Sequence, residues 1–170
     1  KAPVELWYNR VNFFGGWYMR FLAVFLGVVG LDRIVKYWVQ QSLPLNQSVP
    51  VIEPVLYWTY IKNQGAAFGF FQGMNGFLML CAALVIGGAL IYIMSRRPRP
   101  AMVTSLALVT AGACGNLIDR ILFGGVIDYI DIKVWPIFNL ADMAIVVGSL
   151  LIILYVGFFS PEEEGSLWKE

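Results

Sequence analysis

The chain has 170 residues, of which 59% are hydrophobic and only 14% are charged. Soluble domains carry about 25% charged residues, so this composition predicts an integral membrane protein. The formal net charge is +1 and there is no basic tract, which argues against a nucleic-acid partner. Histidine is absent and only two cysteines are present, which excludes imidazole catalysis and the common zinc and disulfide frameworks. We therefore expect neither a cofactor nor a metal.

Four apolar stretches are long enough to cross a bilayer, which takes about 20 mostly apolar residues in a helix. They cover residues 17–39, 76–94, 101–123 and 139–159. The first resembles the core of a signal peptide, but no small-residue cleavage site follows it, so we expect a retained helix. Residues 1–16 are expected to form a separate helix at the membrane interface. Residues 1–170 are thus predicted to form a single integral membrane domain.

The basic residues predict the orientation of these spans, because cytoplasmic flanks of membrane helices are enriched in Lys and Arg. The link "SRRPRP" between the second and third spans contains three arginines, and three basic residues precede or open the first span. The links after the first and third spans contain one lysine each, Lys62 and Lys133. This distribution predicts that both termini are cytoplasmic and that segments 41–75 and 124–138 face outward.

Segment 41–75 has the composition of β-strands. The run "SVPVIEPVLYWTYIKNQGAAFGFF" is rich in Val, Ile and aromatic residues and is interrupted by Pro and Gly. We expect a small β-sheet on the outer surface of the membrane. The predicted fold class is therefore a membrane all-α protein of four transmembrane helices with a small β element.

Charged side chains are predicted to gather at one depth, just below the outer surface. Asp119 lies about 27 Å along the third span from its inner end, at 1.5 Å per residue. Asp142 lies in the first turn of the fourth span, Asp128 in the short outer link, and Asp32 with Lys36 in the outer half of the first span. Ionisable groups inside a membrane are costly and normally face the bundle interior or a water-filled cavity.

Each of these acids also has a structural interpretation. Asn139 followed by Asp142 fits the start of a helix, with the amide as cap and the acid near the positive end of the helix dipole. Structural ion pairs are the alternative at helical or adjacent spacing: Asp32 with Lys36, and Asp119 with Arg120. Asp128 could be an ordinary loop acid, and Asp131 is expected at the surface. These interpretations do not explain why so many acids share one depth.

If Asp128 and Asp142 face each other, they can perform hydrolysis without a histidine, a metal or a serine. Two neighbouring carboxylates cannot both ionise cheaply, so the pair shares a proton near neutral pH, as in aspartic proteases. The ionised acid takes a proton from water, which attacks an amide carbonyl. The protonated acid then donates to the developing oxyanion.

Five motifs follow one another along the chain: "DRIVK" at 32–36, "NQGAAFG" at 63–69, "GACGNLIDR" at 112–120, "VIDYI" at 126–130 and "FNLADMAI" at 138–145. With these motifs in this order, the chain resembles the lipoprotein signal peptidases, the bacterial type II signal peptidases. Each motif alone is weak, but the ordered set is specific and covers nearly the whole chain. Met143 and Cys114 stand where the family commonly has smaller residues, and neither departure removes a carboxylate.

The resemblance implies an endopeptidase that cleaves prolipoproteins before a diacylglyceryl-modified cysteine, at the outer face of the bacterial cytoplasmic membrane. It implies a catalytic pair, Asp128 and Asp142, and an extracytoplasmic β-cradle above the four helices. Asp32 and Lys36 would support the fold. The substrate-binding residues would be Asn63, Gly65, Asn116, Asp119, Arg120 and Asn139. The implied partners are prolipoprotein signal peptides and membrane lipids, with the chain a monomer.

Two other functions are compatible with the acids. A small transporter or channel could use Asp32, Asp119 and Asp142 as a proton or cation relay. A noncatalytic protein could use the same groove to bind a lipopeptide. A relay should place its acids along the membrane depth, whereas these acids gather at one edge, which favours the peptidase.

Overall fold

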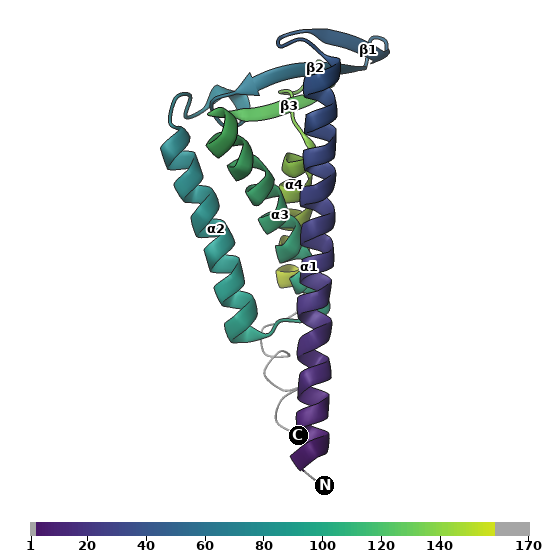
Figure 1. Ribbon diagram of the computed structural model, residues 1–170, viewed down its shortest axis with the longest axis vertical. Coiled ribbons are helices and arrows are strands. Elements are labelled where there is room, and N and C mark those ends of the chain that lie inside the picture. Colours follow the sequence, from purple (N-terminus) through teal and green to yellow (C-terminus); the bar gives the residue numbers. More distant parts are fainter. Residues whose placement is uncertain (1–2, 159–170) are drawn as a thin grey trace.

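The computed structural model describes residues 3–158, and the side chains of residues 16–66 and 68–158 (Figure 1). The sequence analysis predicted that both chain termini are cytoplasmic. The terminal residues lie outside the described part of the chain. Within them, four α-helices form a bundle that a three-stranded sheet covers at one end (Figure 1). The helices are α1 (Pro3–Ser42), α2 (Asn75–Arg96), α3 (Pro100–Phe123) and α4 (Leu140–Phe158).

Three of the described helices, α2, α3 and α4, are long and apolar enough to cross a membrane. The first helix, α1, carries Asp32, Arg33 and Lys36 within its C-terminal half and is not one of the three. It is one continuous helix of 40 residues, in place of the separate interfacial helix expected over residues 1–16. No proline interrupts it after Pro3, and the pair Gly15–Gly16 alone does not break the helix.

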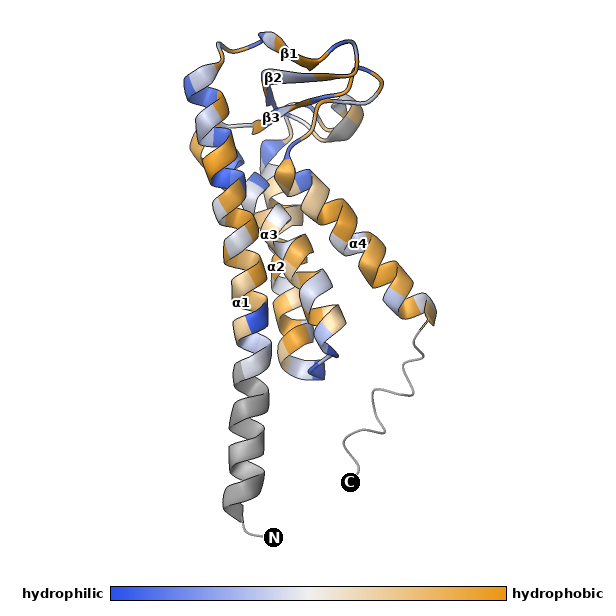
Figure 2. Ribbon diagram, turned by 90° about the vertical axis from the view of Figure 1, so that its right-hand side faces the viewer, coloured by the Kyte–Doolittle hydropathy of each residue, from blue (hydrophilic) through white to orange (hydrophobic). Residues whose placement is uncertain are grey.

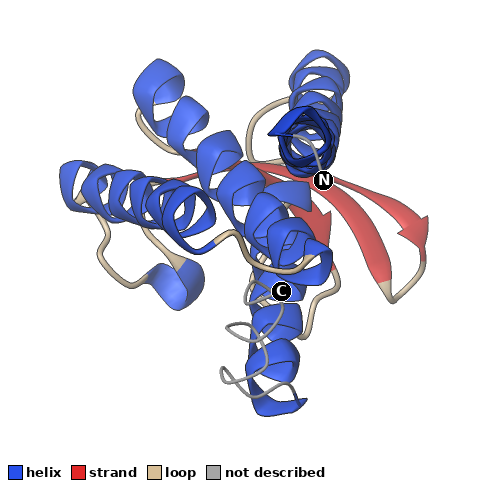
Figure 3. Ribbon diagram, turned by 90° about the horizontal axis from the view of Figure 1, so that it is seen from below, coloured by secondary structure: helices blue, strands red, loops and turns tan. Residues whose placement is uncertain are grey.

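Many large apolar residues of the bundle are exposed. The hydropathy colours show that α4 consists mostly of apolar residues (Figure 2). Leu84 and Ile91 on α2 are 65% and 68% exposed, and Ile153 on α4 is 66% exposed. Helix α3 lies at the centre, where it packs against α1, α2 and α4 (Figure 3). An apolar outer surface with buried polar residues inside is the arrangement expected of a helix bundle whose surface contacts lipid.

Small residues let α3 approach α4 and α1 closely. A Cβ atom added at Gly112 would collide with the carbonyl oxygen of Ala141, and one at Gly148 would lie 2.7 Å from that of Ser105. A Cβ atom at Gly115 would lie 2.7 Å from the carboxylate of Asp32. Such close approach of backbones is typical of helix packing in membranes. It fixes the first turn of α4 against the C-terminal half of α3.

The sheet contains β1 (Ser48–Ile52), β2 (Leu56–Asn63) and β3 (Val126–Asp131), antiparallel and in that order. The first two strands confirm the strand prediction for segment 41–75. The third lies in the link that was predicted without a strand, and it pairs Asp128 with Ile61 of β2. All but one residue of β3 are buried, because helices cover one of its faces and the following segment, through Phe138, covers its edge.

Candidate active site

Asp128 lies in the middle of β3 and is only 2% exposed. Both of its carboxylate oxygens accept a hydrogen bond from an asparagine side chain. Nδ2 of Asn139 donates to Oδ1 at 2.7 Å, and Nδ2 of Asn63, at the end of β2, donates to Oδ2 at 3.0 Å. The neighbouring strand and the start of α4 thus hold this carboxylate from two sides.

Asp142 lies in the first turn of α4 and forms a capping box with Asn139. The side-chain oxygen of Asn139 accepts the backbone N–H of Asp142 at 2.9 Å, and Oδ2 of Asp142 accepts the backbone N–H of Asn139 at 3.2 Å. The structural interpretation of Asp142 as part of a helix start is therefore confirmed. The other carboxylate oxygen of Asp142, Oδ1, takes no part in this cap and accepts a hydrogen bond from Nδ2 of Asn116 at 2.7 Å.

Asn139 joins the two acids. Its side chain is fully buried, and its Nδ2 also lies 3.2 Å from both Oδ1 of Asn116 and the carbonyl oxygen of Ile127. One asparagine therefore contacts Asp128 through its amide nitrogen and Asp142 through its backbone and amide oxygen. Asp128 and Asp142 therefore share one asparagine as a hydrogen-bond partner.

Three asparagine amides are oriented so that each points its NH₂ group at a carboxylate. Each amide oxygen already accepts from a group that can only donate, because a backbone N–H or an ammonium has no acceptor. These oxygen contacts are Gly65 N to Asn63 at 2.9 Å, Asp142 N to Asn139 at 2.9 Å, and Lys36 Nζ to Asn116 at 3.2 Å. The acids are thus held by amide donors whose direction the surrounding fold determines.

Burial and the neighbouring Asp142 carboxylate raise the pKa of Asp128 to about 7. The hydrogen bonds from Asn63 and Asn139 act in the opposite direction and do not cancel this rise. Among the described residues, no lysine or arginine forms a salt bridge with either Asp128 or Asp142. Asp128 therefore gains or loses its proton near neutral pH.

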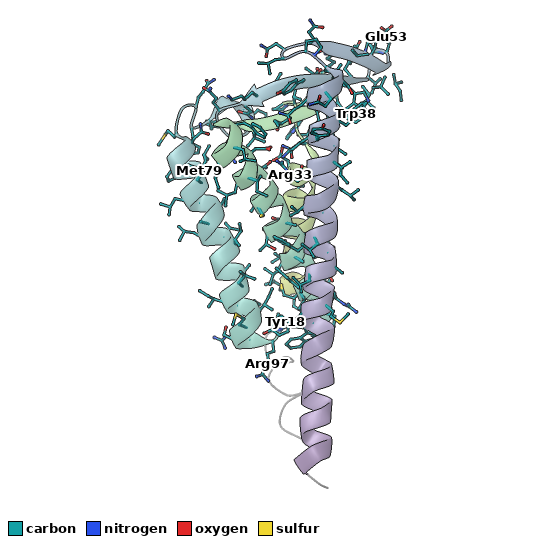
Figure 4. The ribbon with its side chains drawn as sticks, in the orientation of Figure 1. Tyr18, Arg33, Trp38, Glu53, Met79 and Arg97 are labelled. Atoms are coloured by element: carbon teal, nitrogen blue, oxygen red, sulfur yellow. The ribbon has the colours of Figure 1, made fainter. Side chains whose placement is uncertain are left out.

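A second group of acids lies next to this pair, in the layer below the sheet where Figure 4 labels Arg33. We call it the ion cluster: Asp32, Arg33, Lys36 and Asp119. Lys36 contacts Asp32 at 2.9 Å and Asp119 at 2.7 Å, and Arg33 contacts Asp119 at 2.6 Å. The predicted Asp32–Lys36 pair is confirmed. The alternative pairing of Asp119 with Arg120 is wrong, because Asp119 contacts Arg33 and Lys36 of α1 while Arg120 donates to the carbonyl oxygen of Gly65.

A cavity of about 610 Å³, which we call the catalytic cavity, opens beside the two acids. Six of the eight residues predicted for catalysis or substrate binding line it: Asn63, Gly65, Asn116, Arg120, Asp128 and Asp142. Asn139 lies behind them, and Asp119 is fully buried in the ion cluster, where its Oδ2 accepts the backbone N–H of Ile127 at 3.2 Å. Most of the remaining wall is apolar and comes from α4 and from residues 132–138.

Sequence reasoning missed the part of the wall formed by residues 132–138, among them Trp135 and Phe138. Their only signals were the apolar run "VWPI", which has no helical or strand period, and the place of Phe138 at the start of the motif at 138–145. Arg120 and Gly65 form a further contact at the cavity, since Nη2 of Arg120 donates to the carbonyl oxygen of Gly65 at 3.0 Å. Gly65 also has no room for a side chain, because a Cβ atom would lie 2.6 Å from the carbonyl oxygen of Phe70.

The sequence analysis expected Asp131 at the surface, and this prediction is wrong. Asp131 is buried at the end of β3. Its Oδ2 accepts from the hydroxyl of Thr59 at 2.9 Å and from Nζ of Lys133 at 2.7 Å. Burial alone would raise the pKa of Asp131, but these hydrogen bonds outweigh it and lower the pKa. Asp131 thus forms a structural contact between strands and lies outside the catalytic cavity.

Residues 24–158 match the sequence pattern of the family described as signal peptidase (SPase) II. The chain belongs to the signal peptidase II family. Lipoprotein signal peptidases of Syntrophomonas wolfei and Halothermothrix orenii are 46% and 43% identical to it, over 86% and 78% of this chain and 98% and 92% of theirs. A bacterial membrane enzyme solved at 2.3 Å resolution is 30% identical, with a TM-score of 0.76 over 88% of this chain and 92% of that one.

These similarities confirm three predictions made from the sequence. The chain is a multi-pass bacterial membrane protein, its fold is four helices with a small antiparallel sheet, and its enzyme class is the aspartic endopeptidase signal peptidase II. They leave the role of each site residue to be argued from the geometry.

Proposed function

We propose that this protein removes the signal peptide from diacylglyceryl-modified prolipoproteins, cutting before the lipidated cysteine, with Asp128 and Asp142 as its catalytic pair. The observation that carries the proposal is the contact of both acids with Asn139 at the wall of one cavity. Carboxylates placed in this way, without a salt bridge to a described cation, are suited to share a proton and to activate water.

Each acid accepts two hydrogen bonds, so we assign the proton within the pair from the position of the acids in the fold. Asp142 lies at the positive end of the α4 dipole, and we therefore take Asp142 as the ionised member. Its charge helps to raise the pKa of Asp128 to about 7, so Asp128 is the member that carries the proton. Lys36 supports this assignment, since its contact with the oxygen of Asn116 turns the NH₂ group of Asn116 toward Asp142.

The reaction then follows in balanced steps. Asp142 accepts a proton from water while the water oxygen bonds to the scissile carbonyl carbon, and Asp128 gives its proton to the carbonyl oxygen. Asp142 next donates its proton to the amide nitrogen, the C–N bond breaks, and Asp128 regains a proton from a hydroxyl of the collapsing diol. The products are the free carboxyl end of the signal peptide and the free amino group of the lipidated cysteine.

Different predicted residues take different roles in this proposal. Asn63, Asn116 and Asn139 hold the catalytic acids, and Gly65 with Arg120 presents polar groups of the cavity to the substrate backbone. Asp119, predicted to bind substrate, joins Asp32 and Lys36 as a residue that supports the fold, because it contacts their cluster and β3 instead of the cavity.

The active site is proposed to lie at the outer face of the cytoplasmic membrane, with both termini inside and the chain acting as a monomer. The supporting observation is that Arg97, in the basic link between α2 and α3, lies at the end of the bundle opposite the sheet (Figure 4). Lipid chains of the substrate would remain in the bilayer beside the apolar wall of α4, which places the scissile amide at the level of the acids.

Cleavage of a synthetic peptide with a diacylglyceryl cysteine tests the proposal directly. The purified protein in lipid should release one fragment that ends before the cysteine, as mass spectrometry would show. A matched peptide with an unmodified cysteine should be cut far more slowly. Absence of cleavage, together with proton or cation flux in liposomes, would support the transporter alternative, and tight binding without cleavage would support the noncatalytic one.

A further inference from the structure

A second cavity, of about 400 Å³, adjoins the catalytic cavity, and we call it the polar cavity. It lies between the end of β2, the segment 64–72 and the pair Pro136–Ile137. Four residues line both cavities: Asn63, Ala66, Pro136 and Ile137. Asn63 donates to Asp128, so the two cavities meet one side chain away from the catalytic pair.

The two cavities differ in chemistry. Apolar side chains of α4 and of residues 132–138 form most of the catalytic cavity, whereas Lys62, Gln64 and Gln72 contribute polar groups to the second one. An edge-to-face contact of Phe68 with Trp135, at 5.2 Å between ring centres, lies between the two cavities, since Phe68 lines one and Trp135 the other. A bound peptide that crosses this boundary passes from an apolar to a polar environment.

Lys62 is the only charged residue in the wall of the polar cavity. It is exposed and forms no salt bridge with another described residue, in contrast to Lys36 and Lys133, which contact aspartates at 2.7 Å. The described part of the chain also provides no hydrogen-bond partner for the side chains of Gln64 and Gln72. These side chains can therefore bind a ligand without first breaking a contact within the protein.

We propose that the polar cavity is a binding site for the residues that follow the lipidated cysteine, and that Lys62 gives it a preference for acidic side chains there. This inference rests on the proposed function, which places the scissile amide at Asp128. The lipid chains and the signal peptide remain with the apolar wall, so the chain beyond the cysteine leads toward water past Asn63. The amides of Gln64 and Gln72 donate to and accept from an extended backbone, and Lys62 pairs with a carboxylate.

Competition between peptides measures this preference. Three diacylated peptides share one sequence up to the cysteine and carry Glu, Gln or Lys at successive positions after it. An exposed ion pair changes an equilibrium about 1.4- to 5-fold at low ionic strength. We expect the wild-type protein to favour Glu over Gln by this factor in kcat/KM, to disfavour Lys, and to lose the preference at high salt. Lys62→Glu should reverse the order.

Lys133→Glu is the matched control, because it makes the same change of charge close to the same sheet but lies outside both cavities. It should leave the order of the three peptides as in the wild type. Equal kcat/KM for all three peptides, or a reversal by Lys133→Glu as well, would overturn the assignment of the polar cavity. Failure of the wild type to cut any of the peptides would instead refute the proposed function.

Discussion

Two groups of buried aspartates lie side by side in this protein, and their partners differ. Asp32 and Asp119 in the ion cluster contact two cations, Arg33 and Lys36, at 2.6 to 2.9 Å. Asp128 and Asp142 accept hydrogen bonds from amides and have no salt bridge to a described residue. The ion pairs connect α1 with α3, whereas we propose that the amide-bound pair exchanges a proton with substrate and water.

Hydrogen bonds connect the two groups. Lys36 donates to Asn116, and Asn116 donates to Asp142, so the cluster orients a donor of the catalytic pair. The cations remain one side chain away from the catalytic acids, which keeps the carboxylates from forming an inert ion pair. A membrane bundle can thus contain both kinds of acid at one depth and use only one of them for chemistry.

The largest effect should come from replacing either catalytic acid. Asp128→Asn and Asp142→Asn should each lower kcat about a thousand-fold or more, since the amide can neither activate water nor donate the shared proton. Each variant should still fold, because the substitution is isosteric, but its new NH₂ group faces a hydrogen-bond donor, so the melting temperature should fall by a few degrees only. Turnover within ten-fold of the wild type in either variant would show that the pair is not catalytic.

Replacement of an acid in the ion cluster should give the opposite result. Asp32→Asn removes the carboxylate that contacts both Lys36 and Arg33, and breaking a buried ion pair costs about 3–5 kcal/mol. Thermal or denaturant unfolding in detergent should show this loss, while kcat of the folded fraction falls far less than in Asp128→Asn. A large fall in kcat with unchanged stability would mean that the cluster participates in catalysis.

A smaller effect is expected where α3 meets α4. Gly112→Ala places a methyl group against the carbonyl of Ala141, next to Asp142, and overpacking of this kind costs about 1–3 kcal/mol. Both stability and kcat should fall, because the first turn of α4 must move. Gly88→Ala on α2 is the control, since its Cβ has no atom within 4 Å, and it should be neutral or stabilising. Equal behaviour of the two variants would contradict this account of the packing.

The apolar runs predicted the helices well because a span of about 20 residues is a strong signal. Strand β3 was missed because its six residues lie in a link between two spans, and only the contact with β2 makes them a strand. The motifs contain the two acids that we propose as catalytic and the asparagines that contact them. The direction of the Asn116 amide could not be predicted, since Lys36, 80 residues away, determines it.

The wall of the catalytic cavity was also beyond prediction. Trp135 and Phe138 belong to a segment of irregular backbone, where no periodicity indicates which side chains face inward. The place of Asp119 was misjudged for a related reason. Its motif combines it with Arg120, but the helix turns the two side chains toward different neighbours.

The proton that we assign to Asp128 should make activity depend on pH. Its pKa of about 7 predicts that kcat falls as the pH rises through that value, because the donor of the carbonyl proton is lost. The same raised pKa means that the folded state binds this proton more tightly than the unfolded chain. The free energy of unfolding should therefore decrease as the pH rises from about 4 to about 7.

The most direct test is the titration of Asp128 itself, followed by the infrared carbonyl band of its protonated carboxyl group and assigned by the loss of that band in Asp128→Asn. The wild type should titrate near 7, and Asp142→Asn should titrate lower, because the neighbouring charge is removed while burial remains. A midpoint close to the ordinary value of 3.8 in the wild type, or an unchanged midpoint in Asp142→Asn, would contradict a shared proton.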